Sequence, residues 1–188
     1  VTAGRREPIV GVVGALQLRS VEGLVRVLDA RGSVQVASIN NLVRLERITG
    51  GIDAESVNGD IQMSNVDSHD VDASSVNGNV QFLGPFQPRG RYRLASHNGN
   101  LCVGVPVGAD VDVSVHNFRG AFRNGLLPPV GPHGAGSRFT FTLGGGGSSL
   151  ELQSFQGFIQ LLRSNEILLP QVPPPAPRPP SVPRAEDR

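Results

Sequence analysis

Two pairs of aspartates come closest to the residue types and spacing of a catalytic site. Asp70 and Asp72 lie two residues apart, and so do Asp110 and Asp112. Residues two apart on a β-strand share a face, so each pair would present two carboxylates together. A glycosidase or polysaccharide lyase needs two or three carboxylates, or a carboxylate with an arginine, on one exposed face. Such pairs more often mark a solvated strand face, and we therefore expect no catalytic residues and no enzyme.

Calcium is the metal against which an acidic repeat should be tested. Calcium-binding nonapeptide rolls place an aspartate in every turn, because Ca²⁺ prefers oxygen ligands. Here the acidic residues include Asp53, Asp60, Asp67 and Asp72. They are not expected to occupy one common position of the nine-residue repeat that is described below. The sequence therefore predicts a fold that does not depend on calcium.

Two of the four histidines raise the question of zinc. His97 and His116 are separated by about the length of one coil of the repeat, so their rings could stack; the others are His69 and His133. Zinc takes three or four ligands that are held by a second shell of hydrogen bonds. We therefore favour corner side chains with local hydrogen bonds, and expect no metal site.

The remaining reactive groups predict no cofactor site. The single cysteine, Cys102, excludes an internal disulfide and a cysteine-based zinc site, and it is expected to point away from the core. Residues 144–147 are all glycine but lack the Lys-Ser/Thr of a phosphate-binding loop. An aromatic sugar-binding surface is a further possibility, although packing in the core or cap is favoured for its candidates, Tyr92, Phe86 and Phe118.

A nine-residue repeat would position all of these groups. Glycine or asparagine recurs every nine residues at Gly14, Gly23, Gly32, Asn41, Gly50 and Gly59, and apolar residues follow two, four and seven residues after each. The first two apolar residues predict one short strand per unit with one buried face. The third, such as Val21 or Ile39, is expected to fill the interior at the corner. Glycine or asparagine would supply the left-handed backbone of a sharp corner.

A second motif, Ser-x-x-Gly/Asn, shows that one coil contains two units. It recurs in every second unit at Ser20, Ser38 and Ser56, and again at Ser75 and Ser96. This predicts an all-β fold, a right-handed parallel β-solenoid with two facing sheets and roughly 18-residue coils. The corners continue at Gly78, Gly99 and Gly157, and a side-chain ladder is expected at Asn40, Asn58, Asn77 and Asn98.

The C-terminal half keeps this pattern with insertions. Loops are expected at 68–69, 83–89 and 123–137. Phe139 and Phe141 alternate in Arg138–Leu143, and this aromatic segment is the expected cap of the last coil. Proline makes up more than half of the stretch from 170 to 183, which predicts a disordered tail. We therefore expect a lead-in at 1–10, the solenoid at 11–163 and the tail at 164–188.

The Ser-Val-Asn-Gly corners carry a family resemblance, together with Ser154-Phe-Gln-Gly-Phe-Ile-Gln-Leu after a glycine-rich turn. Over roughly residues 11–163 the chain resembles the bacterial adhesin family of β-strand repeats, also called toastrack-like, whose function is not assigned. The resemblance implies an exported or membrane-attached protein outside the cytoplasmic membrane. Some relatives are associated with envelope-stress signalling, and the family implies no catalytic residues.

Composition narrows the expected function. The net charge of +1 gives no electrostatic basis for nucleic-acid binding, and no apolar run approaches the roughly 20 residues of a membrane span. Because the chain starts at Val1, we expect that an export signal or anchor has been removed. We therefore expect an extracytoplasmic, non-enzymatic surface module that contacts envelope proteins or polysaccharide. The alternatives are a polysaccharide-acting β-helix enzyme and an extracytoplasmic sensor of an envelope-stress system.

Overall fold

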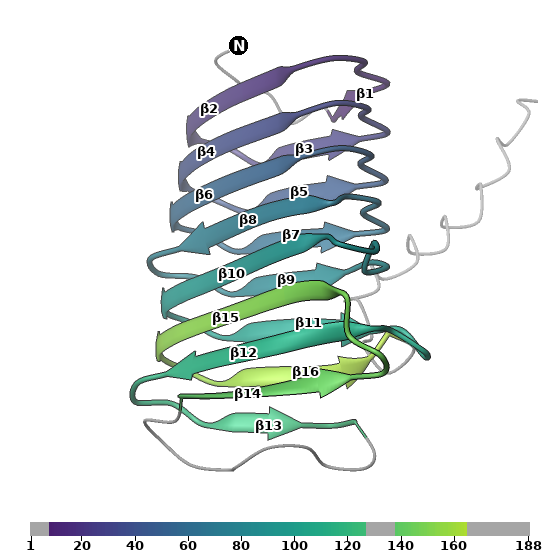
Figure 1. Cartoon of the computed structure of the whole chain (residues 1–188). Helices are drawn as coiled ribbons and strands as arrows, with labels where there is room; N and C mark the ends of the chain where they lie inside the picture. The colour runs from purple at the N-terminus through teal and green to yellow at the C-terminus, as the bar shows by residue number, and fades with distance from the viewer. Residues whose placement is uncertain (1–7, 127–137, 165–188) are drawn as a thin grey trace, which may run out of the picture.

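Residues 8–126 and 138–164 are described by the structure, a computed structural model, and they form sixteen strands and no helix. Two eight-stranded sheets face each other along the length of the molecule (Figure 1). In spatial order sheet A contains β14 (Arg138–Leu143), β12 (Val111–Asn117), β15 (Ser148–Gln156), β10 (Arg91–Asn98), β8 (Asp70–Ser75), β6 (Ile52–Asn58), β4 (Val34–Asn40) and β2 (Leu16–Glu22). Sheet B contains β1 (Ile9–Val10), β3 (Val25–Leu28), β5 (Val43–Glu46), β7 (Ile61–Ser64), β9 (Val80–Leu83), β11 (Leu101–Val105), β16 (Ile159–Arg163) and β13 (Phe122–Asn124).

The predicted all-β fold with two facing sheets is confirmed. Odd units of the repeat form sheet A and even units form sheet B, and equivalent residues of successive coils pair in parallel, as in Val34 with Ile52 and Val43 with Ile61. The paired residues Val34 and Ile52 lie 18 residues apart in the sequence. The insertions lengthen this separation by one residue between Ile52 and Val71 and by three residues between Val71 and Tyr92. The predicted right-handed winding stays a prediction.

The apolar residues of the strands form the core, as the alternation predicts. Val34 and Val36 of β4 and Val43 and Leu45 of β5 are at most 3% exposed. Leu16 is only half-buried, because β2 is the edge strand of sheet A. In these coils each strand thus contributes two inward apolar side chains to one continuous cluster.

The third apolar position of the repeat was predicted to be buried, and in sheet A this prediction is wrong. Its members there are exposed, with Val21 at 59%, Ile39 at 43% and Val57 at 43%. These strands run for seven residues, so the alternation continues and a serine takes the third inward position. In sheet B the prediction is confirmed, since Ile48 and Val66 are fully buried. There each four-residue strand is followed by a left-handed residue, Arg47 or Asn65, which turns the next side chain inward.

The corner glycines serve two different purposes. A left-handed φ occurs at the predicted corners Gly14, Gly23, Gly32, Gly50 and Gly157, but not at Asn41, Gly59, Gly78 or Gly99, where the predicted backbone conformation is wrong. A close approach of the neighbouring coil explains the glycines at Gly59, Gly78 and Gly99, and it acts together with the left-handed φ at Gly32, Gly50 and Gly157. A Cβ atom on Gly78 would lie 2.1 Å from the Gly59 carbonyl oxygen, and one on Gly99 would lie 2.1 Å from that of Gly78. The coils stack too closely there for any side chain.

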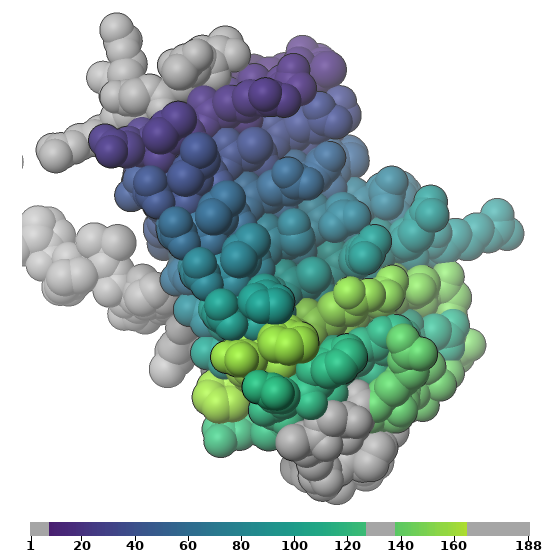
Figure 2. Space-filling view, turned by 90° about the vertical axis from the view of Figure 1, so that its left-hand side faces the viewer, coloured from purple at the N-terminus to yellow at the C-terminus, as the bar shows by residue number. Residues whose placement is uncertain are grey.

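The C-terminal coils do not stack in sequence order. The yellow-green β15 lies between β10 and β12, and β16 lies between β11 and β13 in the other sheet (Figure 1). Figure 2 shows the same yellow-green layer below the teal coil. The glycine-rich turn after β14 therefore passes the start of β12, and Asp110 holds it there by accepting a 2.6 Å hydrogen bond from the Gly145 amide.

Aromatic residues close the C-terminal end, as predicted. β14 is the antiparallel edge strand of sheet A, and its Phe139 ring packs 4.9 Å from that of Phe122. At the other end β1 pairs with β3, so Ile9–Val10 of the predicted lead-in belong to sheet B. Likewise β13 (Phe122–Asn124) overlaps the start of the predicted 123–137 loop. Residues 127–137 and the Pro-rich tail from 165 lie outside the described residues.

Candidate functional site: the outer face of sheet A

The outward side chains of sheet A form straight rows across the strands, because every strand pairs in register with its neighbour. In the middle row Asp53 of β6 is the direct partner of Asp72 of β8. Arg93 of β10 follows Asp72, and Glu151 of β15 follows Arg93. Parallel strands lie about 4.8 Å apart. Four charged side chains from distant parts of the sequence are therefore immediate neighbours.

A hollow of about 610 Å³ lies over this row. Its charged lining consists of four carboxylates and two guanidinium groups, from Asp53, Asp70, Asp72, Glu151, Arg91 and Arg93. Asp70 and Asp72 share this face, as their spacing predicts. The Arg91 Nε atom lies 3.9 Å from the Asp70 carboxylate, and both side chains are largely exposed. The hollow therefore offers hydrogen-bond donors and acceptors side by side.

The prediction that the acids do not share a repeat slot is wrong for Asp53 and Asp72. The insertion at 68–69 shifts the register by one residue, and this shift brings the two aspartates opposite each other. Asp60 and Asp67 lie elsewhere, in the two corners between the sheets. Among the described residues no three histidine, cysteine or acidic side chains are arranged to hold a metal ion.

The electrostatic environment of the hollow acts most strongly on Asp72. Loss of water contacts raises the pKa of its carboxyl group above the ordinary value, and Arg93 opposes this shift. The nearby carboxylates of Asp53, Asp70 and Glu151 raise the pKa of Asp72 further. The Asp72 carboxyl group therefore takes up a proton more readily than an isolated aspartate does.

Two smaller hollows extend the site along the same face. One of about 130 Å³ shares Gln35 and Asp53 with the large hollow and continues toward β2. The other, of about 450 Å³, lies at the ends of β10, β15 and β12. It adjoins the large hollow at Gln153, whose Nε2 atom donates a 2.5 Å hydrogen bond to Glu151. The three hollows together cross sheet A diagonally, from β2 to β14, over all eight strands or about 34 Å along the solenoid axis.

Side-chain ladders hold the neighbouring corner rigid. Asn58 donates to Asn40 at 3.1 Å, Asn77 donates to Asn58 at 2.8 Å, and Asn98 donates to Asn77 at 2.8 Å. These are the four asparagines for which the sequence predicts a ladder. A second ladder, which the sequence analysis missed, runs beside it: Asn79 donates to Asp60 and Asn100 donates to Asn79, both at 3.1 Å. Its signal was a polar residue directly after each of three corner glycines.

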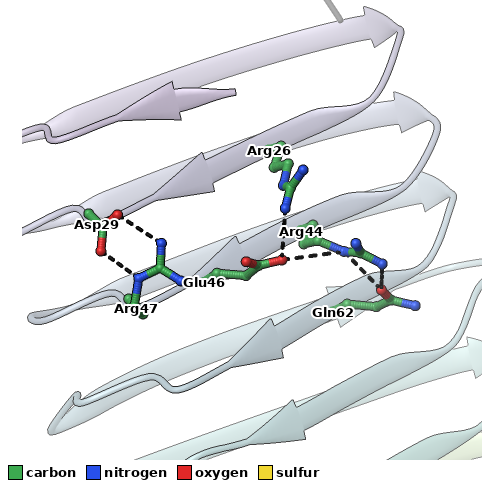
Figure 3. A network of polar contacts seen from close by, with 6 residues as sticks. All are labelled: Arg26, Asp29, Arg44, Glu46, Arg47 and Gln62. Atoms are coloured by element: carbon green, nitrogen blue, oxygen red, sulfur yellow. Dashed lines mark hydrogen bonds and ion pairs between the residues drawn. The ribbon is translucent and has the colours of Figure 1, made fainter. Parts of the chain in front are cut away.

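The outer face of sheet B, in contrast, is occupied by contacts among its own side chains. Arg44 donates to Gln62 at 2.8 Å, and Glu46 forms ion pairs with Arg26 and Arg44 (Figure 3). At the adjoining corner Arg47 forms two hydrogen bonds with Asp29, and this guanidinium lowers the pKa of the Asp29 carboxyl. Apart from the buried Arg26 Nε atom, these charged groups are already paired with one another.

The other predicted candidates have structural roles or lie apart. Asp110 and Asp112 bind the segment around β14, since Asp112 accepts a 2.6 Å hydrogen bond from Thr142. Tyr92 is buried, and its hydroxyl donates to the Ser68 carbonyl and accepts from the Gln87 amide. The half-buried Phe86 ring packs 4.9 Å from that of Tyr92.

His97 and His116 do not form the stack that was considered as an alternative, because β15 separates the strands that carry them. Phe155 occupies the place beside His97, and the two rings stack at 4.6 Å. Cys102 lies half-buried in β11, and burial raises the pKa of its thiol. Neither His97 nor Cys102 lines the large hollow.

No family model, curated protein or solved structure matches the chain at a significant level. The described residues also contain no helix that is long and apolar enough to cross a membrane. Function is therefore inferred from the geometry of sheet A.

Proposed function

We propose that the protein is a non-enzymatic binding module that holds a neutral polysaccharide along the outer face of sheet A. The observation that carries this proposal is the series of three adjoining hollows on that face. A linear polymer fits such a series better than a compact ligand, which would need one enclosed pocket. The rigid stack of coils keeps the binding groups at a constant spacing, so little order is lost on binding.

The chemistry of the lining favours a neutral polymer rich in hydroxyl groups. Carboxylates accept hydrogen bonds, arginines donate them, and a hydroxyl group can pair with either. A strongly anionic polymer would meet the carboxylates of Asp53, Asp72 and Glu151, and a strongly cationic one would meet Arg91 and Arg93. The mixed charges of the hollow thus disfavour both.

An extracytoplasmic location is part of the proposal. It is supported by the resemblance of the Ser-Val-Asn-Gly corners to the adhesin-like repeat family, in which surface contact is the expected role. Binding to many similar groups along a polymer would suit attachment to a cell envelope, because several weak contacts add up along one chain.

Retention on immobilised neutral polysaccharides tests the proposal, with β-glucan, chitin, mannan and galactan as probes. The double variant Asp53→Asn/Arg93→Gln should bind at least tenfold more weakly than the wild type. A matched variant on sheet B, Arg44→Gln/Glu46→Gln, removes one acid and one arginine and should bind normally. Failure of all four polymers to bind, or equal weakening by both variants, would overturn the proposal.

Polysaccharide hydrolysis is a second candidate, favoured by the neighbouring positions of Asp53 and Asp72. Retaining glycosidases use two carboxyl groups about 5–5.5 Å apart, one protonated and one ionised. The raised pKa of Asp72 would suit the acid, and Asp53 would be the nucleophile. Release of new reducing ends from the same four polymers, abolished by Asp72→Asn, would establish this activity in place of simple binding.

A further inference from the structure

We infer that the aromatic corner at the ends of β10, β15 and β12 is a stacking site for one pyranose ring of the bound polysaccharide. The site consists of His97, Phe155 and Phe118 together with the polar side chains of Gln153, His116 and Arg138, and it encloses the 450 Å³ hollow. This inference rests on the proposed function and names the part of the ligand that the corner recognises.

The three rings lie in one row because they occupy the same corner position on neighbouring strands. The imidazole of His97 and the ring of Phe155 are parallel within 4° and 4.6 Å apart. Phe118 follows at 5.4 Å from Phe155, and it is 70% exposed. In the preceding coils this position holds exposed aliphatic residues instead, at Val21, Ile39, Val57 and Val76. The aromatic surface is therefore confined to the C-terminal end of the row.

The exposure of Phe118 is the feature that needs an explanation. A phenylalanine in solvent loses the stabilisation that burial of its ring would provide. The flat face of an aromatic ring is a suitable platform for a ligand with an apolar face. Phe155 supports this platform from the neighbouring strand, and the Arg119 guanidinium lies 6.0 Å from the centre of the Phe155 ring.

The polar side of the hollow supplies hydrogen-bonding groups for the hydroxyl groups of a sugar. Arg138 approaches His116 to 3.3 Å, and the other ring nitrogen of His116 lies 3.3 Å from the Ser114 hydroxyl. These contacts hold donors and acceptors beside the aromatic row. A pyranose presents a C–H face and a rim of hydroxyl groups, so it needs both an apolar platform and polar neighbours. A β-1,4-linked ring with all its hydroxyl groups equatorial has the flattest C–H faces.

The probes are cellohexaose and chitohexaose, titrated calorimetrically into the full chain. Phe118→Leu keeps an apolar side chain but loses the flat ring, and it should raise the Kd about tenfold. Phe118→Tyr keeps the ring and should bind like the wild type. Val57→Leu is the matched control, since it changes an exposed residue in the same row, outside the hollow.

The results separate this inference from the proposed function. Binding of a hexasaccharide with the same Kd in wild type and Phe118→Leu would overturn the stacking site while leaving the binding face in place. Failure of wild type to bind either hexasaccharide would also overturn it, and the panel of four polymers would still decide the proposed function. Equal weakening by Phe118→Leu and Phe118→Tyr would show a packing role for this residue and contradict ring stacking.

Discussion

At the scale of single residues, strand length decides whether an apolar side chain is buried. Val57 and Val66 occupy the same position of the nine-residue repeat, yet Val57 is 43% exposed and Val66 is fully buried. The difference arises because β6 has seven residues and continues past the inward serine, whereas β7 has four. Ser56 occupies the inward position in β6.

The two valines therefore predict opposite responses to the same substitution. Val66→Asp places an unpaired charge in the core and should cost several kcal/mol, enough to abolish cooperative unfolding or lower the Tm strongly. Val57→Asp leaves its carboxylate in solvent and should change the free energy of unfolding by about 0.5 kcal/mol or less. Thermal denaturation compares them, and equal destabilisation would contradict the observed orientation of the strands.

Two aspartates predict opposite changes of stability with pH. The folded-state pKa of Asp72 is raised, so its ionisation disfavours the folded state as the pH rises through that pKa. Asp72→Asn should therefore raise the Tm relative to wild type at pH 7 and lose this advantage near pH 3. The pKa of Asp29 is lowered by Arg47, so Asp29→Asn should lower the Tm slightly at pH 7 and have no effect at low pH. Melting curves at both pH values test both signs.

At the scale of the elements, close contact between coils determines which residue types fit at the corners. Gly78 lies above Gly59, and a Cβ atom on it would also come within 2.8 Å of the Ser75 hydroxyl. Neither the Gly59 backbone nor the buried serine can move away without disturbing the next coil. Glycine is thus required by packing alone here, whereas at Gly50 it is required both by a φ of 121° and by the close approach of the Gly32 carbonyl group.

Gly78→Ala should destabilise the protein by about 1–3 kcal/mol, because overpacking forces the coils apart. Gly51→Ala provides the control: its Cβ would meet no atom within 4 Å, and its φ is outside the left-handed region. Chemical denaturation should leave Gly51→Ala within about 0.5 kcal/mol of wild type. A tolerated Gly78→Ala would show that the coils are spaced more widely than the structure has them.

The strands of the first four coils could be predicted from sequence, because their repeat offsets are constant or nearly so. The proposed binding face could be predicted only in part. Asp70 and Asp72 were recognised as a pair, but Arg93 and Glu151 were not, since they are direct partners in the sheet yet lie far apart along the chain. The strand register that makes them neighbours depends on loop lengths and on the order of the last coils. The local alternation of apolar residues contains no information on either of these.

At the scale of the whole molecule, the order of the C-terminal coils could not be predicted from the repeat. β12 and β15 both alternate buried and exposed residues, so either would fit beside β10 by pattern alone. The link after β11, with Pro106 and two turn residues, lets the chain skip one layer. The nine-residue β15 then fills the gap and pairs on both sides.

The inserted coil predicts an unequal response to two truncations. Removal of residues 165–188 leaves all sixteen described strands in place and should not change the Tm. Removal of residues 148–188 also deletes β15 and β16, which leaves β12, β13 and β14 without the neighbours that join them to the stack. This shorter chain should expose apolar surface and bind a hydrophobic dye. A cooperative melt at the wild-type temperature would contradict the observed strand order.

The fold is also predicted to be independent of metal ions. The core is an apolar cluster and the corners are joined by hydrogen bonds between amide side chains. Addition of EDTA should therefore leave the Tm unchanged, whereas a calcium roll would unfold. A decrease of tens of degrees would contradict this account of the corners.

The inserted coil has a mechanical consequence, which would matter if the proposed attachment to a surface holds. A load applied through the C-terminal side of the chain would reach β16 first, and β16 is held by β11 on one side and by β13 on the other. In a solenoid wound in sequence order the last strand has one neighbour and can be peeled away alone. Here rupture must break two rows of hydrogen bonds at once, so we expect extension to start at the opposite end, where β1 pairs through only two residues.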